Sequence, residues 1–323
     1  MDYAIQFCGR RQVAIAEIER PARPDEGHVL GTTLYSLISP GTELMSGFMA
    51  EESEGTRRPG YASVFRVEHT AGESAGLAPG DLALCMGRHQ SYQHVASSMT
   101  VKVPAGVAAD LAVLTRLMNV SMTTLMTTSA RPGELVFVMG AGPVGLLAAL
   151  LFQRCGYKVA VCDPDERRLS LARKAGIVTV MTEVPPDGAQ WREQAALVLE
   201  CSGHEAAVLE GCRLVRKRGE VVLIGVPWQR RTELYAHELL SLVFHRYVVL
   251  RSGWEWEIPM QAAPFQPHSI MGNLRKGMAW LAEGWLNVDG LVRKVLPRDA
   301  NAVYNQLAER QIAEPFVVFD WMA

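Results

Sequence analysis

The sequence predicts an α/β unit with a parallel sheet that interrupts a domain built from short strands. Three observations support this fold class. Short β-like runs between turn residues fill the first hundred positions, and strands alternate with helices from about residue 108. After about residue 253 the alternation stops, and residues 315–321 form a closing apolar run. A chain of 323 residues is also longer than one compact core usually allows.

The first segment is expected to form a small barrel or sandwich. Residues 29–36, 62–67 and 82–86 are short extended runs, and a Pro-Gly turn adjoins each of them. No helical periodicity separates these runs, which favours a β-rich arrangement.

The middle segment begins with residues 109–129, an apolar, Met-rich stretch without Pro or Gly that predicts a helix or a helix pair. Nearly continuous apolar strands then alternate with helices, as in a parallel sheet covered on both faces. The strands are expected at 135–139, 158–162, 196–200 and 220–224, and the helices at 144–154, 166–174 and 205–215. Residues 216–218, Arg-Lys-Arg before a glycine, are expected to form the last turn of a helix.

Composition and charge exclude several classes of protein. The 32 Lys and Arg residues nearly balance 34 Asp and Glu residues, whereas a nucleic-acid-binding protein usually carries a basic excess. None of the six cysteines forms a C-x-x-C pair, so neither a zinc ribbon nor a thioredoxin-like redox motif is indicated. In a chain of this length they do not indicate a disulfide framework either. The start of the chain lacks the charged-then-apolar pattern of a signal peptide.

Residues 135–152 contain no charged side chain and are long enough to suggest a membrane span. Three glycines and a proline lie in the middle of this stretch, and they divide it into a strand and a helix. We therefore expect a soluble cytoplasmic protein with neither a membrane nor a nucleic acid as its partner.

The sharpest motif is the glycine turn between the first apolar strand and the helix after it. It has the spacing G-x-G-x-x-G, and Asp163 ends the next strand. Such glycines allow a tight turn, a close approach of the backbone to a pyrophosphate, and close packing of helix on sheet. The free N–H groups at the start of the helix would face the phosphates. The motif comprises Gly140, Ala141, Gly142, Pro143, Val144 and Gly145.

Asp163 predicts a preference for NAD, because a carboxylate binds the adenosine ribose hydroxyls and repels a 2′-phosphate. Arg167 and Arg168 leave NADP open, since an arginine just past the strand could accommodate that phosphate. Ligands of open parallel sheets lie beyond the carboxyl ends of the strands. The loops after the next two strands are therefore expected to line the nicotinamide side, through Cys201, Ser202, Gly225 and Val226.

Three further stretches add to the glycine turn: residues 35–44 (YSLISPGTEL), 59–64 (PGYASV) and 79–81 (PGD). Through them the chain resembles the medium-chain dehydrogenase/reductase superfamily over essentially its whole length. The first two stretches are most similar to the zinc-independent sugar- or alcohol-dehydrogenase-like branch, which includes bacteriochlorophyllide a dehydrogenase and two-part oxidoreductases. The resemblance implies a Rossmann domain, a doubly wound parallel sheet, inserted in a split GroES-like β-barrel catalytic domain. The parts would be residues 1–117, 118–252 and 253–323.

The resemblance also predicts the absence of zinc. Zinc-dependent relatives carry a Cys, a His-Glu pair, and a Cys or acidic residue at three positions. In this chain those positions fall near Ser39, on Tyr61 and Ala62, and near Asn119. None of them offers a thiolate or an imidazole, and the four-cysteine loop of structural zinc is missing. We therefore expect no bound metal.

Without a Lewis acid, alcohol oxidation needs hydrogen-bond donors and a path for the proton. The resemblance assigns the relay hydroxyl beside the nicotinamide ribose to Thr42. Tyr61 stands where the zinc-binding His would be, and a phenol can donate to the substrate oxygen. Ser39 and Asn119 could complete a polar cradle, and Glu43 is an alternative structural hydrogen-bonding residue.

The substrate pocket is expected to be walled by His89, Trp254 and Trp256. The leading hypothesis is an NAD-dependent, zinc-independent oxidoreductase that interconverts a secondary alcohol, either cyclic or a polyol, and a ketone. One alternative is an NADPH-dependent enoyl or quinone reductase, and another is a dinucleotide-binding sensor with little catalysis. The resemblance further implies a homodimer that pairs around residues 247–251.

Overall fold

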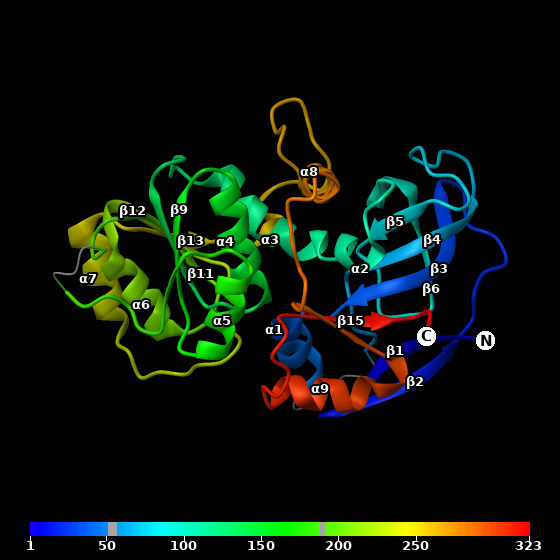
Figure 1. Ribbon diagram of the computed structural model, residues 1–323, viewed down its shortest axis with the longest axis horizontal. Coiled ribbons are helices and arrows are strands. Elements are labelled where there is room, and N and C mark those ends of the chain that lie inside the picture. The colour runs from blue at the N-terminus through cyan, green and yellow to red at the C-terminus, as the bar shows by residue number, and fades with distance from the viewer. Residues whose placement is uncertain (51–56, 188–190) are drawn as a thin grey trace. The chain divides into compact units, whose positions relative to one another are not determined.

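The computed structural model describes residues 1–50, 57–187 and 191–323 of the chain (Figure 1). The chain divides into two compact units, one of residues 1–116 with 271–323 and the other of residues 117–270. Both termini belong to the first unit, so the second unit is inserted in its sequence. The predicted second boundary lies at 252/253, whereas this division falls at 270/271.

The second unit contains a parallel six-stranded sheet in the order β10-β9-β8-β11-β12-β13. This is the doubly wound order of a Rossmann fold, in which the strand order reverses at β8. Its central strands β8 and β11 are nearly continuous, buried apolar runs, as the sequence predicts, although β11 ends in Glu200. The strands are β8 (Leu135–Met139), β9 (Lys158–Cys162), β10 (Thr179–Met181), β11 (Ala195–Glu200), β12 (Val215–Leu223) and β13 (Val249–Ser252).

Helices cover both faces of this sheet. Figure 1 shows α4 and α5 on one side of the strands and α6 and α7 on the other. Helices α4, α5 and α6 bury apolar residues, and α7 packs partly buried apolar residues against the same core, so both faces of the sheet are covered. The helices are α3 (Thr115–Thr127), α4 (Pro143–Arg154), α5 (Glu166–Lys174), α6 (Glu205–Leu214) and α7 (Ala236–Arg246).

The long apolar stretch 135–152 forms β8, the glycine turn and α4, as predicted. Within the part of the chain that the structure describes, no helix is long and apolar enough to cross a membrane.

The basic cluster at residues 216–218 is not the end of a helix, so that prediction is wrong. Helix α6 ends at Leu214, because Val215 is extended (ψ 146°) and begins β12 beside Ala195. Val215 is fully buried in the apolar core, and this burial outweighs the helical preference of the residues around it. Arg216 instead pairs with Glu134 at 2.6 Å.

The first unit contains a seven-stranded sheet in the order β14-β15-β3-β4-β5-β7, with β6 also paired to β3. All of its pairs are antiparallel except β14 with β15. A separate hairpin, β1 (Asp2–Gly9) with β2 (Gln12–Ile18), lies outside this sheet. The strands of the sheet are β3 (His28–Leu37), β4 (Ser63–Thr70), β5 (Leu82–Cys85), β6 (Tyr92–Ala96), β7 (Thr100–Lys102), β14 (Val292–Val295) and β15 (Phe316–Asp320).

Short helices complete the first unit. Helix α1 (Pro40–Glu43) runs directly into a π-helical turn, Leu44–Phe48, and α2 (Ala109–Ala112) follows β7. The later helices are α8 (Ile270–Ala282) and α9 (Ala300–Ala308). This architecture and the sheet of the second unit confirm the predicted fold class, a Rossmann fold inserted in a split GroES-like unit.

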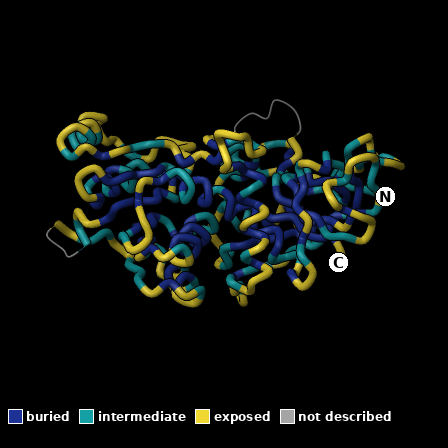
Figure 2. Tube along the Cα trace, turned by 90° about the horizontal axis from the view of Figure 1, so that it is seen from above, coloured by how far each residue is buried: buried dark blue, intermediate teal, exposed yellow. Residues whose placement is uncertain are grey.

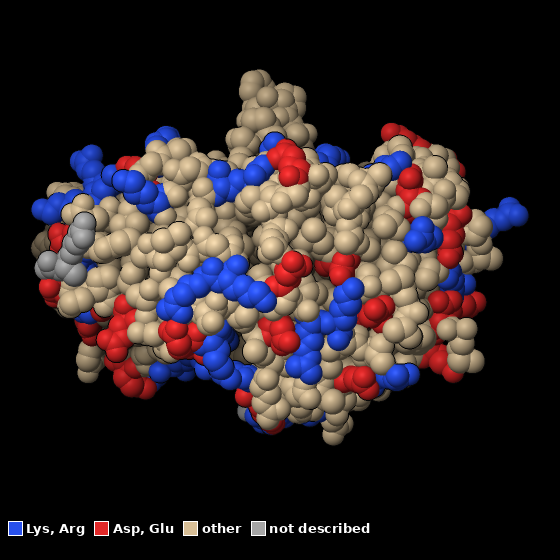
Figure 3. Space-filling model, viewed as in Figure 1, with Lys and Arg blue, Asp and Glu red and all other residues tan. Residues whose placement is uncertain are grey.

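Burial and charge follow the expectations for a folded protein of near-neutral charge. The trace in Figure 2 carries its buried residues along the interior segments and its exposed residues on the outer turns. On the face drawn in Figure 3, basic and acidic side chains are interspersed.

Candidate active site

The glycine turn has the geometry that a dinucleotide needs. Gly140 has a φ of 99°, which only glycine adopts without strain. A Cβ on Gly145 would lie 1.8 Å from the carbonyl oxygen of Gly140, so helix α4 can pack this closely only because the residue is glycine. A Cβ on Gly142 would meet no atom within 4 Å. The backbone at Gly142 thus faces open space at the N-terminus of α4, where an anion is favoured.

Asp163 joins the end of β9 to this turn. Its carboxylate accepts hydrogen bonds from the backbone N–H groups of Ala141 (2.7 Å) and Asp165 (2.8 Å). Arg168 lies 3.3 Å from the same carboxylate, and the side chain of Asp163 is only 3% exposed. The acid predicted to hold the ribose therefore also fixes the glycine turn, and the more exposed Arg168 lies next to it.

The loops after β11 and β12 come together at the carboxyl edge of the sheet. Gly225 donates a backbone hydrogen bond of 2.7 Å to the carbonyl of Glu200, and Cys201 donates one of 2.8 Å to the carbonyl of Met139. These bonds place Cys201 and Ser202 beside Gly225 and Val226. Burial raises the pKa of the Cys201 thiol well above its usual value, so this cysteine is a poor nucleophile.

The sequence reasoning did not single out Glu200, whose carboxylate organises the first of these loops. It accepts hydrogen bonds from the backbone N–H groups of Ser202 (2.8 Å) and Gly203 (3.0 Å), and from the Ser202 hydroxyl. Burial raises the pKa of Glu200 despite these bonds. The sequence did contain a signal for Glu200, because it is an acidic residue at the end of an apolar strand.

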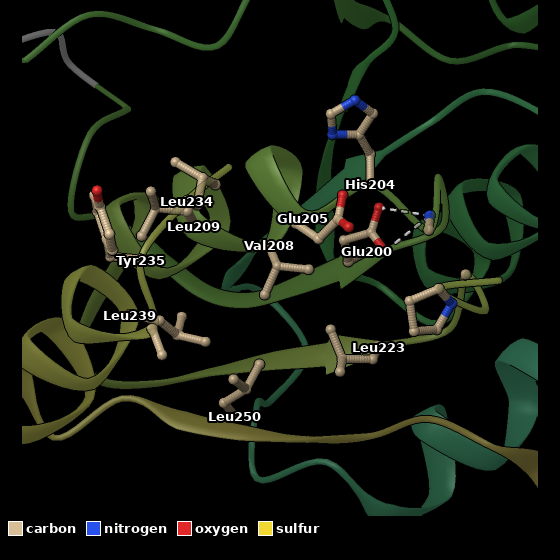
Figure 4. Close-up of a pocket in the computed structure, with 14 residues that line it drawn as sticks. Glu200, His204, Glu205, Val208, Leu209, Leu223, Leu234, Tyr235, Leu239 and Leu250 are labelled. Carbon is tan, nitrogen blue, oxygen red and sulfur yellow. Dashed lines mark hydrogen bonds between the residues drawn. The ribbon is translucent and has the colours of Figure 1, made fainter. Parts of the chain in front are cut away.

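An apolar cavity of about 320 Å³ lies next to this loop (Figure 4). Glu200 and Gly225 line one part of it, and the rest lies between α6, α7 and the strands β12 and β13. Figure 4 shows leucine and valine side chains around the cavity, with the bonds from Gly203 to Glu200 dashed. The labelled apolar side chains are Val208, Leu209, Leu223, Leu234, Leu239 and Leu250.

Three of the predicted catalytic residues lie together in the first unit. The Tyr61 hydroxyl donates a hydrogen bond of 2.5 Å to Oγ of Ser39, and the Thr42 side chain is a further hydrogen-bond partner. Ser39 is the N-cap of α1 and Thr42 lies within that helix, so one turn of helix presents both hydroxyls. The half-buried phenol of Tyr61 therefore lies in a group of polar hydroxyls.

The side chain of Glu43 holds the first turn of α1 in place through hydrogen bonds. Its Oε1 accepts a hydrogen bond from the backbone N–H of Ser39 (2.8 Å), and its Oε2 accepts one from the Tyr304 hydroxyl (2.5 Å). His89 Nε2 lies 3.0 Å from the same Oε2. Glu43 is thus the structural hydrogen-bonding residue that the sequence analysis held open as an alternative.

His89, which is predicted to wall the substrate pocket, lies in the interior of the first unit. Its side chain is fully buried, with Nδ1 2.7 Å from Oγ of Ser36 and Nε2 bonded to Glu43. The ring also packs edge-on against Phe319 at 5.0 Å between centroids. Both ring nitrogens of His89 therefore have polar partners in the interior, as buried polar groups require.

Arg116 provides a positive charge beside Tyr61. Its guanidinium carbon lies 4.6 Å from the centroid of the Tyr61 ring, and Arg116 is 3% exposed. Burial raises the pKa of Tyr61; the Arg116 charge and the Ser39 hydrogen bond lower it, and the Glu43 carboxylate adds to the rise. The phenol is therefore protonated at neutral pH. The sequence analysis missed Arg116 because its position in an apolar helical stretch gives no indication of this partner.

Asn119, the fourth predicted catalytic residue, belongs to the second unit. It lies fully buried in α3, and its side-chain amide donates a hydrogen bond to the carboxylate of Glu255. Glu255 lies between the two predicted wall residues, Trp254 and Trp256, which are 65% and 47% exposed. The amide of Asn119 thus fixes the aromatic segment in this unit.

The pair at the predicted zinc position does not fit zinc. Ser39 and Tyr61 offer hydroxyl oxygens that are bonded to each other, whereas zinc in proteins prefers thiolate, imidazole and carboxylate ligands. In residues 1–50, 57–187 and 191–323, no three His, Cys, Asp or Glu side chains form a group that could hold a metal ion.

Sequence comparisons relate parts of the chain to dehydrogenases, and they do not test the predicted absence of zinc. Residues 143–254 match a family model described as zinc-binding dehydrogenase. A sorbitol dehydrogenase of Halalkalibacterium halodurans is 29% identical over 224 residues, which cover 62% of this chain and 64% of that protein. A 2-dehydro-3-deoxy-L-galactonate 5-dehydrogenase of Pseudoalteromonas atlantica is 26% identical over 259 residues, or 69% of this chain and 76% of that protein. The match thus spans less than two thirds of the sorbitol dehydrogenase.

Solved structures share the whole fold. Galactitol-1-phosphate dehydrogenase from Escherichia coli has a TM-score of 0.83 at 15% identity, covering 98% of this chain and 99% of that one. Acetophenone reductase from Geotrichum candidum, solved in complex with NAD, has a TM-score of 0.79 at 14% identity, covering 99% and 97%. At these identities the structural likeness shows the fold alone.

Proposed function

We propose that this chain is a medium-chain dehydrogenase/reductase, an oxidoreductase that interconverts a secondary alcohol and a ketone with NAD and without zinc. The reaction is alcohol plus NAD⁺ to ketone plus NADH plus a proton. The observation that carries the proposal is the bonded pair of hydroxyls, Tyr61 and Ser39, at positions where zinc-dependent relatives hold their metal.

The residues of the glycine turn fit a dinucleotide. The open backbone at Gly142 and the N-terminus of α4 would hold the pyrophosphate, and Asp163 would hold the adenosine ribose. The loops at Ser202 and Val226 would border the nicotinamide. When bound, NAD supplies the hydride acceptor at its nicotinamide ring.

The hydroxyl group of Tyr61 would exchange a proton with the substrate oxygen. In the direction of ketone reduction, Tyr61, which is protonated at neutral pH, would donate its proton to the carbonyl oxygen of the substrate. In the direction of oxidation, the tyrosinate accepts the proton of the alcohol. Ser39 and Thr42 would orient the phenol and stabilise its charged form through hydrogen bonds.

The substrate is proposed to be a small polyol or a cyclic secondary alcohol. The relatives named above act, by their names, on sorbitol and on a sugar acid. The exposed indole rings of Trp254 and Trp256 would cover the apolar face of such a molecule.

A panel of polyols, sugars, cyclitols and cyclic alcohols, assayed for NADH formation, tests this function. We expect turnover with NAD that exceeds turnover with NADP, and no loss after dialysis against a chelator. Activity with NADPH and an enoyl or quinone substrate alone would favour the first alternative. Cofactor binding without turnover on any substrate would favour a sensor. One tightly held zinc per chain would contradict zinc independence.

A homodimer is also proposed, through the edge of the sheet in the second unit. Within the described part of the chain, strand β13 lies at the edge of the sheet and pairs only with β12. Helix α7 has no buried residue, and Leu240 and Phe244 on it are 62% and 76% exposed. An apolar helix beside an edge strand is typical of a surface that a second copy covers.

A further inference from the structure

Arg116 is an unusual residue for its place in the fold. It is the second residue of α3, in the first turn, where a cation opposes the helix dipole. It is also nearly fully buried, and the loss of hydration makes a buried guanidinium costly. Neither the helix nor burial favours arginine here, so a specific interaction must favour its charge.

The contact between Arg116 and Tyr61 is a specific interaction that favours the positive charge. The guanidinium lies over the ring, 4.6 Å from its centroid, and a cation at this distance is attracted by the π face. The interaction is strengthened where water is excluded. Because the attraction grows when the phenol becomes phenolate, the arginine favours the charged form of Tyr61 over the neutral form.

The other groups around Tyr61 also affect its pKa, and the Arg116 charge acts against some of them. Two charged side chains stand among the main influences on its pKa, Arg116 from α3 and Glu43 from α1. Burial and the Glu43 carboxylate oppose ionisation of the phenol, whereas Arg116 and the hydrogen bonds with Ser39 and Thr42 favour it. Removal of the Arg116 charge would therefore shift this balance toward the neutral phenol.

We propose that Arg116 is a positioning residue that holds the Tyr61 ring and stabilises its oxygen when the phenol gives up its proton. In ketone reduction the O–H bond of Tyr61 breaks, a new O–H bond forms on the substrate oxygen, and the negative charge left on the phenolate lies beside the guanidinium. In oxidation the same charge is present before the proton returns. The catalytic part of this inference rests on the proposed function, but the effect on Tyr61 does not.

The ionisation of Tyr61 can be measured without substrate or cofactor. A 3,5-difluorotyrosine incorporated at position 61 ionises at lower pH than tyrosine and gives a single ¹⁹F resonance, so the seven other tyrosines do not interfere. The resonance is followed against pH in the full chain and in the variants Arg116→Gln and Arg116→Lys. Arg293→Gln is the matched control, since Arg293 lies on the surface of the same unit, 4.0 Å from Glu314.

We expect Arg116→Gln to raise the pKa at position 61 by about one unit or more, Arg116→Lys to raise it by less, and Arg293→Gln to leave it unchanged. If Arg116→Gln does not fold, Arg116→Met keeps the length of the side chain without its charge. An unchanged pKa in a folded Gln or Met variant would overturn the proposal.

Kinetics then separate this inference from the proposed function. With an active substrate, Arg116→Gln should lower kcat at least about tenfold with a smaller change in KM, and Arg116→Lys should restore part of it. A shifted pKa in a protein that turns over no alcohol would support the role of Arg116 and contradict the function. An unshifted pKa in an active dehydrogenase would contradict the role of Arg116 alone.

Discussion

His89 Nε2 lies 3.0 Å from Oε2 of Glu43, and both side chains are almost fully shielded from water. The direction of the bonds around this pair follows from Trp321, whose indole N–H can only donate and lies 2.8 Å from Oγ of Ser36. The Ser36 hydroxyl is then free to donate to Nδ1 of His89, which leaves the proton on Nε2 to donate to Glu43. This chain of bonds ends on the carboxylate that holds the backbone of Ser39.

Glu43→Gln should therefore destabilise the protein. The amide group would place donors against the Tyr304 hydroxyl and the His89 N–H, and buried donors without acceptors are costly. We expect the free energy of unfolding in urea to fall by about 3 kcal/mol. Glu309→Gln, at a half-exposed ion pair with Arg11, is the control and should change it by less than about 0.5 kcal/mol. Equal stability of the two variants would show that the buried network contributes little.

Tyr61→Phe should remove the proton donor while retaining the ring that Arg116 contacts. We expect kcat to fall at least about 100-fold, with the thermal midpoint close to that of the parent protein. Ser39→Ala, which removes the acceptor of the phenol, should cause a smaller loss. Full activity of Tyr61→Phe would mean that the proton passes through another group.

The pH profile follows from the raised pKa of Tyr61. The phenol is protonated below its pKa, and this pKa lies above the usual value of 10.0 because burial outweighs the Arg116 charge. The donor for ketone reduction is thus fully present at neutral pH and is lost only as the pH rises through the raised pKa. Oxidation, which needs the tyrosinate, should accelerate with pH over the same range. A reduction rate that falls between pH 6 and 8 would assign the proton to a different group.

Two glycine variants should separate cofactor binding from folding. Gly142→Ala places a methyl group in open space at a backbone φ of −69°, so the fold should hold within about 1 kcal/mol. We expect its dissociation constant for NADH, measured by fluorescence, to rise at least about tenfold. Gly145→Ala instead drives a methyl group into the carbonyl of Gly140 and should cost about 3 kcal/mol of stability. Normal NADH binding by Gly142→Ala would contradict the assigned phosphate cradle.

Asp165 should contribute to stability in a pH-dependent way. It caps α5 through the backbone N–H of Arg167, and the Arg167 side chain lowers its pKa to about 2. Because the folded-state pKa lies below the ordinary value of 3.8, the contribution is complete above pH 4 and disappears as the pH falls through 2. Asp165→Ala should cost about 1 kcal/mol at pH 7 and clearly less at pH 2, where about half of the folded molecules have a protonated Asp165, by thermal unfolding. An equal cost at pH 7 and pH 2 would exclude an ionised cap as its cause.

The proposed dimer surface can be tested by introducing a charged side chain on it. Phe244→Glu on the exposed face of α7 should convert a dimer to a monomer in light scattering, because a buried carboxylate without a partner opposes association. Val178→Glu is the control, since Val178 is 90% exposed and precedes β10 at the other edge of the sheet. A parent protein that is already monomeric would contradict the homodimer.

The sequence by itself determined the fold class and the turn that would hold the cofactor. Both are encoded locally, because strands and helices follow from the period of apolar residues, and the contact that requires glycine at position 145 is with Gly140, five residues earlier. The prediction from local sequence is wrong where tertiary packing favours a different structure. Arg216 is predicted in a helix but lies in a strand, because Val215 is buried in the sheet core.

Only the tertiary structure decided the surroundings of Tyr61. Ser36, Glu43, His89 and Tyr304 meet through bonds that span up to 261 positions, and no period or spacing in a chain records which distant partner will satisfy a buried polar group. The same applies to Arg116, which lies in an apolar helical stretch by sequence and over the phenol in space. Long-range packing therefore determines the charge that Tyr61 experiences.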